Sequence, residues 1–149
     1  KAAKLIRQGY PLEDIVAQVK KQREKTGIAF SVEDMEALRK SGRLSIVRQS
    51  VGAILNIRPI LCLEKDGGAL VCAGTARGRN AQMQALADRV PEDAVEVIIE
   101  SLGSAYIAPA LAERIRARLP HAAISRATLG PVLAIHIGLD VIGVAWSVE

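Results

Sequence analysis

The apolar positions of residues 11–26 recur at intervals of three and four, which predicts an amphipathic helix. Pro11 stands in its first turn with acidic residues after it, and Thr26–Gly27 ends it. The segment 1–8, closed by Gly9, has the pattern of the last turns of an earlier helix. The chain is therefore expected to begin with two helices, and the longer one carries an apolar stripe of Leu12, Ile15, Val16 and Val19.

A short strand and two further helices are expected between residues 27 and 56. Residues 27–32 are rich in strand formers. Ser31 is placed to cap a helix that runs to residue 40 and stops at Ser41–Gly42. Ser45 is placed to cap the next helix, whose apolar side chains share one side until Asn56 closes it.

Strand signals dominate from residue 57. Residues 57–65 and 69–77 flank Asp66–Gly67–Gly68, a turn sequence that tolerates positive φ, so the two segments are expected to pair as an antiparallel hairpin. A helix capped by Asn80 follows, and then a strand over 94–103. This part of the chain should therefore supply three strands to one sheet.

The remaining segments predict one helix and three strands. Ser104 opens a helix over 105–119, and residues 122–129 have the alternation of a strand. The long apolar run after them is expected to form two more strands, with turns at Gly130–Pro131 and near Gly138 to Asp140.

Hairpins mixed with helical crossovers imply a mixed sheet. About four helices and about six strands predict an α/β fold, a two-layer domain with a mixed sheet of about six strands covered by helices. The 149 residues are the length of one domain, so residues 1–149 are expected to form a single unit. Half of the residues are apolar but only 3% are aromatic, so the core should consist of Val, Ile, Leu and Ala. One face of the sheet is expected to stay partly uncovered.

Positive charge gathers in the first third of the chain. The net charge is +4, and residues 1–48 hold 11 Lys or Arg against 6 Asp or Glu. Such an excess could attract nucleic acid, but the aromatic residues that stack bases are nearly missing, which favours solvated helix faces and no nucleic-acid partner. A regulatory or nucleic-acid-associated α/β domain that uses this basic half remains the alternative, and steeply salt-dependent binding would favour it.

Several classes of function lack their signals. No apolar run is long enough for a membrane span, and no signal peptide is recognisable. Cys62 and Cys72 have neither CxxC spacing nor a histidine cluster, so no metal is expected, and they are interpreted as buried thiols of a cytoplasmic protein. Whether they face each other across the hairpin depends on the turn. The chain begins at Lys1, inside a helix and without Met, which suggests a piece of a longer protein.

Three cationic positions are candidates for binding an anion. Arg43 precedes the helix that Ser45 caps, and Arg77 stands at another helix start, so each combines a guanidinium with the positive end of a helix dipole. His136 is expected on a strand face that it shares with small residues, away from the bulkier core. From spacing alone, exposed arginines and a structural histidine are the commoner interpretations. No nucleophile elbow, Walker loop or HExxH motif accompanies them, so the protein is expected not to be an enzyme.

Three blocks of sequence resemble the DegV family. FSVEDMEALRKSGRLSIVRQSVGAILNIRPIL (30–61) is similar to the family's leucine-rich helix, its Gly-Gly-Arg-Ile-Ser turn and its Leu-Asn-Ile-Lys-Pro-Ile-Leu strand entry. DGGALVCAGTARGRNAQ (66–82) is similar to its strand ending in an Arg-Gly-Arg helix start. LGPVLAIHIGLDVIGVAW (129–146) is similar to its closing segment of glycine, histidine and Gly-Pro-Gly. The order and spacing of the blocks agree over nearly the whole chain.

The resemblance implies a C-terminal domain that lacks its N-terminal Rossmann-like partner. Such proteins bind one long-chain fatty acid, for example palmitate, bury its acyl chain in the C-terminal domain and hold its carboxylate at the interdomain cleft. Some present that carboxylate to a separate fatty acid kinase. By position, the family's carboxylate ligands correspond to Arg43, Arg77 and His136, while its Ser and Thr ligands belong to the absent domain. No further cofactor is implied.

This interpretation has a physical reason behind it. A carrier for an amphiphile needs an apolar slot with a cation at its mouth, and each buried methylene contributes about 0.8 kcal/mol. Leu55, Ile57 and Ala134 are the candidate wall residues. The departures from the family pattern are Ser41 at the first glycine of the turn, Ile137 after the histidine, and Leu139 and Asp140 in the closing segment. These departures weaken the expectation of a kinase partner more than they weaken the expectation of lipid binding.

Overall fold

The computed structural model describes residues 2–33, 35–42, 57–64 and 68–149. The helices are α1 (Ala2–Arg7), α2 (Leu12–Glu24), α3 (Met35–Lys40), α5 (Gly78–Arg89), a 3₁₀ turn η1 (Ser104–Ile107), α6 (Ala108–Arg118) and α7 (Pro131–Ile137). The strands are β1 (Thr26–Val32), β2 (Ile57–Leu63), β3 (Leu70–Arg77), β4 (Ala94–Leu102), β5 (Ala123–Thr128) and β6 (Val141–Val148). The helix expected over 46–56 lies outside the described residues.

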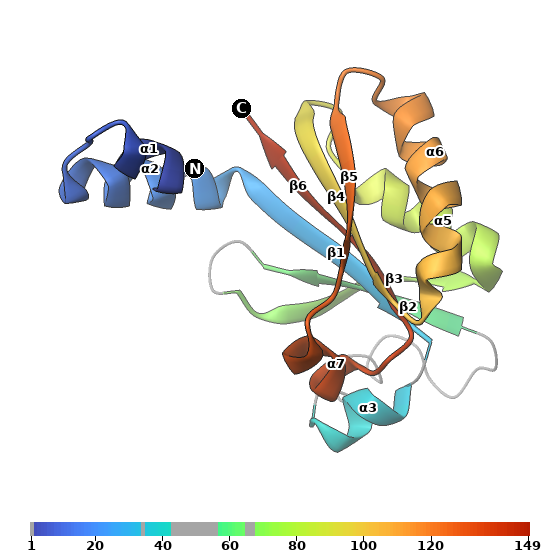
Figure 1. Cartoon of the computed structure of the whole chain (residues 1–149). Helices are drawn as coiled ribbons and strands as arrows, with labels where there is room; N and C mark the ends of the chain where they lie inside the picture. Colours follow the sequence, from blue (N-terminus) through green and yellow to red (C-terminus); the bar gives the residue numbers. More distant parts are fainter. Residues whose placement is uncertain (1, 34, 43–56, 65–67) are drawn as a thin grey trace.

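All the strands belong to one six-stranded sheet of order β3-β2-β1-β6-β4-β5 (Figure 1). Antiparallel pairing joins β3 to β2, β2 to β1, β1 to β6 and β6 to β4, and the edge strand β5 is parallel to β4. The helix α6 makes the crossover that parallel pairing requires. The predicted mixed α/β sheet and the β2–β3 hairpin are thus confirmed.

The first face of the sheet is covered by α5 and α6 (Figure 1). Because side chains alternate along a strand, residues two positions apart project toward the same helices. We call this layer the first core, and its fully buried members include Ile60, Val97, Ile99, Leu86 and Leu111. It holds the larger part of the buried apolar side chains described.

The second face is covered near one end by α3 and α7 (Figure 1). The second core consists of Phe30, Val32, Leu38, Leu61, Ile137 and Val141. Cys72 packs against this core while Cys62 packs against the first, so the two thiols lie on opposite faces of the sheet. Their strand partners are Leu61 and Val71, and they do not pair with each other.

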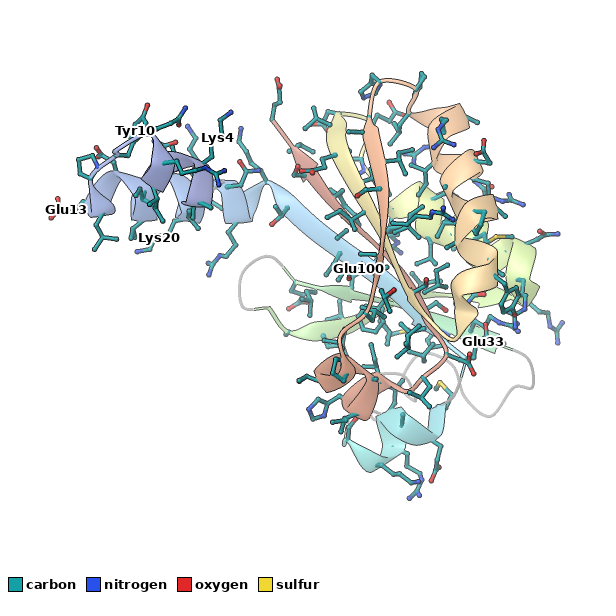
Figure 2. All side chains as sticks on the ribbon, viewed as in Figure 1. Lys4, Tyr10, Glu13, Lys20, Glu33 and Glu100 are labelled. Carbon is teal, nitrogen blue, oxygen red and sulfur yellow. The ribbon has the colours of Figure 1, made fainter. Side chains whose placement is uncertain are left out.

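The first two helices form a hairpin that stands away from the sheet (Figure 1), and its labelled side chains lie clear of the other helices (Figure 2). The predicted helix α2 is confirmed, with Pro11 at its N-cap. Of its apolar stripe, however, only Ile15 is buried, and 75% of Leu12 is exposed. The stripe is therefore uncovered in this chain.

The segment 131–137 forms helix α7, so its prediction as a strand was wrong. Gly130 is its N-cap, Pro131 is fixed in a helical φ at the first position, and Gly138 ends it with φ 94°. The two predicted turns are therefore the two ends of a helix. The segment is apolar except for His136 and fits both the helical and the strand period, and the Pro and Gly at its ends decide between them.

Candidate functional site

Four of the residues singled out from the sequence are described by the structure, and they lie toward one end of the strands: Ile57, Arg77, Ala134 and His136. Antiparallel pairing places the ends of β1 and β3 beside the starts of β2 and β6. At this edge Val32 pairs with Val141, and Ile57 pairs with Arg77. The short helices α3 and α7 connect to the same edge, since α3 follows β1 and α7 precedes β6.

Arg77 occupies the junction between β3 and α5. Its neighbour Ala76 is buried in the first core, so the alternation of the strand directs Arg77 toward the opposite face, which carries α3 and α7. The side chain is exposed, and Arg77 is the N-cap residue of α5, although its own side chain makes no capping hydrogen bond to the helix amides. Its strand partner is Ile57, which is half-buried. A cation thus lies beside an aliphatic side chain at one end of the second face.

His136 lies in the last turn of α7, where it is exposed, and not on a strand face. The interpretation that it shares a strand face with Val132 and Ala134 is corrected accordingly. Ala134 is half-buried on the same helix. The imidazole thus stands at the carbonyl end of a helix and is open to solvent.

Ser41 connects α3 to α7. Its hydroxyl donates to the backbone oxygen of His136 at 2.8 Å and lies 3.3 Å from that of Leu38. The turn Ser41–Gly42 is therefore held beside the histidine. Arg43 and Leu55, the other two predicted site residues, lie outside the described residues.

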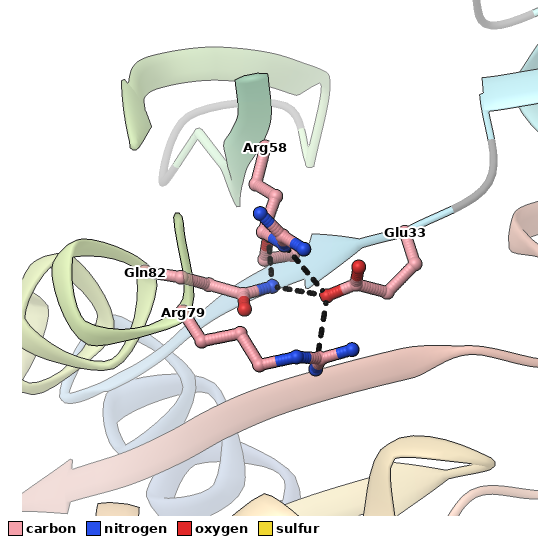
Figure 3. Close-up of polar contacts among 5 residues, drawn as sticks. Glu33, Arg58, Arg79 and Gln82 are labelled. Atoms are coloured by element: carbon pink, nitrogen blue, oxygen red, sulfur yellow. Dashed lines mark hydrogen bonds and ion pairs between the residues drawn. The ribbon is translucent and has the colours of Figure 1, made fainter. Parts of the chain in front are cut away.

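A polar cluster that the sequence interpretation missed lies at the same edge, on the first face (Figure 3). The carboxylate oxygen Oε1 of Glu33 accepts from Arg58 Nε at 2.8 Å, Arg79 Nη1 at 3.4 Å and Gln82 Nε2 at 3.3 Å. Gln82 is fully buried and also donates to Ser31 Oγ at 2.9 Å. The guanidinium of Arg79 lies 4.9 Å above the ring of Tyr106.

The charges of this cluster stabilise one another. Burial alone would raise the pKa of Glu33, but the hydrogen bond and charge of Arg58, together with Arg79 and Gln82, leave that pKa below its ordinary value. The hydrogen bond to Glu33 correspondingly raises the pKa of Arg58. The cluster thus joins the end of β1 to the start of β2 and the first turns of α5. No sequence motif predicts this cluster, because its residues are far apart in the sequence.

Asp140 has a structural contact in the same region. Its backbone oxygen accepts from the amide of Glu33 at 3.0 Å, and its side chain lies against Gly103, whose φ is 66°. A side chain at Gly103 would collide with Asp140. Asp140 therefore helps to join the ends of β1, β4 and β6, and no sequence signal indicated this contact.

The described part of the chain contains neither a metal cluster nor a membrane-spanning helix. Over residues 2–33, 35–42, 57–64 and 68–149, no group of three His, Cys, Asp or Glu side chains is placed to hold a metal ion. Within those same ranges, no helix is both long enough and apolar enough to span a bilayer.

Comparison with known proteins gives a consistent result. A family model described as "Uncharacterised protein, DegV family" matches residues 1–149. A DegV domain-containing protein of Deinococcus radiodurans is 30% identical over 142 residues, which are 92% of this chain and 50% of that protein. Protein DegV of Bacillus subtilis is 26% identical over 98% of this chain and 53% of its own length. The chain thus spans about half the length of the curated relatives that it matches.

Solved structures share the fold. A Bacillus subtilis protein described as DegV, a fatty acid binding protein, superposes with a TM-score of 0.81 at 25% identity, covering all of this chain and 54% of its own. The fatty acid kinase B3 protein of Streptococcus pneumoniae, crystallised with linoleic acid, has a TM-score of 0.87 at 24% identity over 99% of this chain and 53% of its own. A Eubacterium eligens relative that holds heptadecanoic acid has a TM-score of 0.84 at 20% identity. The match covers 99% of this chain and 54% of that relative.

Proposed function

The chain belongs to the DegV family, and we propose that it binds a long-chain fatty acid without catalysing a reaction of its own. The observation that carries the proposal is the placement of Arg77 and of the histidine helix at one edge of the sheet, next to the apolar second face. Relatives described as fatty-acid-binding proteins support the ligand class.

The head of the ligand is assigned to Arg77, His136 and Arg43. A carboxylate taken from water into an apolar mouth loses hydration, and a guanidinium with an imidazole donor offsets that loss. In our proposal Ser41 fixes the backbone at His136 and so positions the imidazole relative to the turn that precedes Arg43. The backbone amides at the start of α5 add a positive partial charge beside Arg77.

The tail is assigned to the second face. Ile57, Leu55 and Ala134 form the proposed wall next to the head, and Phe30 and Leu61 continue the apolar surface. Burial of each methylene is worth about 0.8 kcal/mol, so the tail supplies most of the affinity and the head fixes its direction.

We further propose that a Rossmann-like domain precedes this one and completes the carboxylate site. The relatives are about twice as long as this chain. Leu12, Ile135 and Leu139 are each at least 69% exposed, and a docked domain would cover them. A fatty acid kinase is the proposed partner, because one relative of this fold is described as a component of such a kinase. The two free thiols suit the reducing cytoplasm, which is the proposed location.

The test is to measure the acyl chains that the protein retains. The protein with its preceding half is purified from cells, and its lipids are extracted and identified by mass spectrometry. Arg77→Ala and His136→Ala should each lower retention about tenfold, because a charged hydrogen bond contributes about 1.5–3 kcal/mol. Arg116→Ala and His121→Ala are the matched controls, exposed and remote from the sheet edge. A folded wild-type protein that never retains an acyl chain would contradict the proposal.

A further inference from the structure

The edge strand β3 contains one residue more than the segment of β2 with which it pairs. Ile60 pairs with Gly74, and the next residue on β2, Leu61, pairs with Cys72. Ala73 is therefore the extra residue of a β-bulge, which the ladder absorbs at this one point. On either side of Ala73 the pairing of β3 with β2 is regular.

The bulge decides which face of the sheet Arg77 occupies. Cys72 packs against the second core and Ala76 belongs to the first, although the two residues are four positions apart on one strand. In a regular strand an even spacing puts both side chains on the same face. The extra residue reverses the alternation once, so Arg77 lies on the second face together with its partner Ile57. Without the bulge, the same sequence would turn one half of β3 to the wrong face.

The half of β3 that precedes the bulge is the more firmly fixed. At the hairpin turn the amide of Glu64 donates to the backbone oxygen of Ala69 at 2.9 Å, and Leu70 packs against the second core. The half that follows the bulge contributes the small side chain of Ala76 to the first core. Because apolar stabilisation scales with buried area, moving Ala76 costs less than moving Leu70. A slip that removes the bulge therefore falls on the half that ends in Arg77.

Two side chains hold the bulge. Arg89 stands at the end of α5, and its Nη2 donates to the backbone oxygen of Ala73. A bulge interrupts the ladder at its extra residue, so this hydrogen bond replaces one that β2 does not supply. The guanidinium lies over Gly74, where a Cβ would be 3.7 Å from Nη2. The thiol of Cys72 donates to the backbone oxygen of Gly74 at 3.3 Å.

We infer that Arg89 is a positioning residue of the carboxylate site: it holds the bulge at Ala73 and so keeps the guanidinium of Arg77 on the second face. This inference rests on the proposed fatty-acid binding and adds a residue that acts on the ligand through Arg77. Arg89 belongs to α5, which covers the first face, so the sheet separates it from the proposed acyl chain. Its effect on binding is therefore indirect.

Arg89→Met removes the hydrogen-bond donor and keeps an unbranched apolar side chain. In the protein with its preceding half, fatty acid retention, measured by mass spectrometry of extracted lipids, should fall about three- to tenfold and not below that of Arg77→Ala. Arg89→Lys still offers a donor and should recover part of the loss. Arg118→Met is the matched control and should leave retention unchanged, because Arg118 donates to the backbone oxygens of Ala87 and Val90 and not to β3.

A double-mutant cycle separates positioning from a general loss of stability. If Arg89 acts through Arg77, Arg89→Met should change retention less than about twofold when Arg77→Ala is already present. A general loss of stability would lower retention by the same factor in both backgrounds. Equal factors in the two backgrounds, or full retention by Arg89→Met alone, would overturn the inference.

Deletion of Ala73 is the complementary experiment. Each remaining residue of β3 keeps its partner on β2, so Arg77 stays on the second face and no bulge has to be held. The shortened protein should retain fatty acid within about twofold of the wild type, and Arg89→Met should have no further effect in it. A folded deletion variant that loses the lipid, or that still depends on Arg89, would overturn the inference. The cycle with Arg77→Ala decides the question by itself if the deletion variant does not fold.

The outcomes separate the two proposals. A wild-type protein that retains no fatty acid refutes the binding function and with it this inference. Full retention by Arg77→Ala refutes the assignment of the head to Arg77, and the inference fails with it. A wild-type protein that retains fatty acid and loses it in Arg77→Ala but not in Arg89→Met refutes the role of Arg89 and leaves the binding function standing.

Discussion

Glu33 joins three side chains of other elements at one end of the sheet. Its side chain is 19% exposed and that of Arg58 only 14%, so this ion pair is largely shielded from solvent, unlike the exposed pair of Glu113 and Arg116. Breaking a shielded pair leaves a poorly solvated charge behind, whereas an exposed partner returns to water at little cost. The two pairs therefore offer a matched comparison within one chain.

Glu33→Gln should lower the free energy of unfolding by about 1–3 kcal/mol, because Arg58 and Arg79 lose their common carboxylate. Urea denaturation followed by circular dichroism measures this change. Glu113→Gln, the exposed counterpart, should leave the midpoint unchanged within error. Equal midpoints for the two variants would mean that the Glu33 cluster contributes no more to the stability of the fold than a surface ion pair does.

The same carboxylate predicts a pH dependence. The pKa of Glu33 lies below its ordinary value of 4.5 in the folded protein, so its contribution to stability is fully present above about pH 4.5. That contribution is lost as the pH falls through the lower folded-state value, because the carboxylate is then protonated in both states. The difference in unfolding free energy between the wild type and Glu33→Gln should therefore be constant from pH 6 to 7 and shrink below about pH 4.5. A difference that grows on acidification would contradict this assignment.

Among the elements, those with a distinctive local signal were predicted from the sequence and α7 was not. The turn Asp66–Gly67–Gly68 predicted the β2–β3 hairpin, and helical spacing predicted α2. The apolar run 131–137 fits either a buried strand or a short helix, and tertiary contact through Ser41 accompanies the helical form. Arg77 was a candidate because it stands at a helix start, and His136 because small residues surround it in the sequence, although the strand expected there is a helix. It missed the Glu33 cluster, because that cluster arises only when the end of β1, β2 and α5 come together.

Gly27 controls how closely β1 approaches β6. A Cβ on Gly27 would overlap the ring of Trp146, its partner on the neighbouring strand. Gly27→Ala should therefore displace the ring, lower the free energy of unfolding by about 1–3 kcal/mol and shift the tryptophan emission maximum. At Gly130, where a methyl group would meet no atom, the same substitution should change stability by less than about 1 kcal/mol. An unchanged emission spectrum in Gly27→Ala would show that the Trp146 ring keeps its environment when residue 27 carries a Cβ.

At the scale of the whole molecule, apolar residues remain exposed on two separate elements. The α1–α2 hairpin exposes Ile6 and Leu12, and α7 exposes Val132 and Ile135, each by at least 63%. Exposed apolar patches are typical of surfaces that contact another domain or protein. Because α7 also carries His136, a domain docked there would close over the head of the proposed ligand.

This arrangement predicts that the 149 residues alone bind lipid poorly. In our proposal the preceding domain supplies further hydrogen bonds to the carboxylate, each worth about 1.5–3 kcal/mol, so the chain alone should retain less than about a tenth of the fatty acid that the longer protein retains. Mass spectrometry of lipids extracted from equal molar amounts of both proteins measures the ratio, and circular dichroism verifies that the shorter chain is folded. Equal retention would instead place the complete carboxylate site within residues 1–149, with the exposed surface of α7 serving another contact.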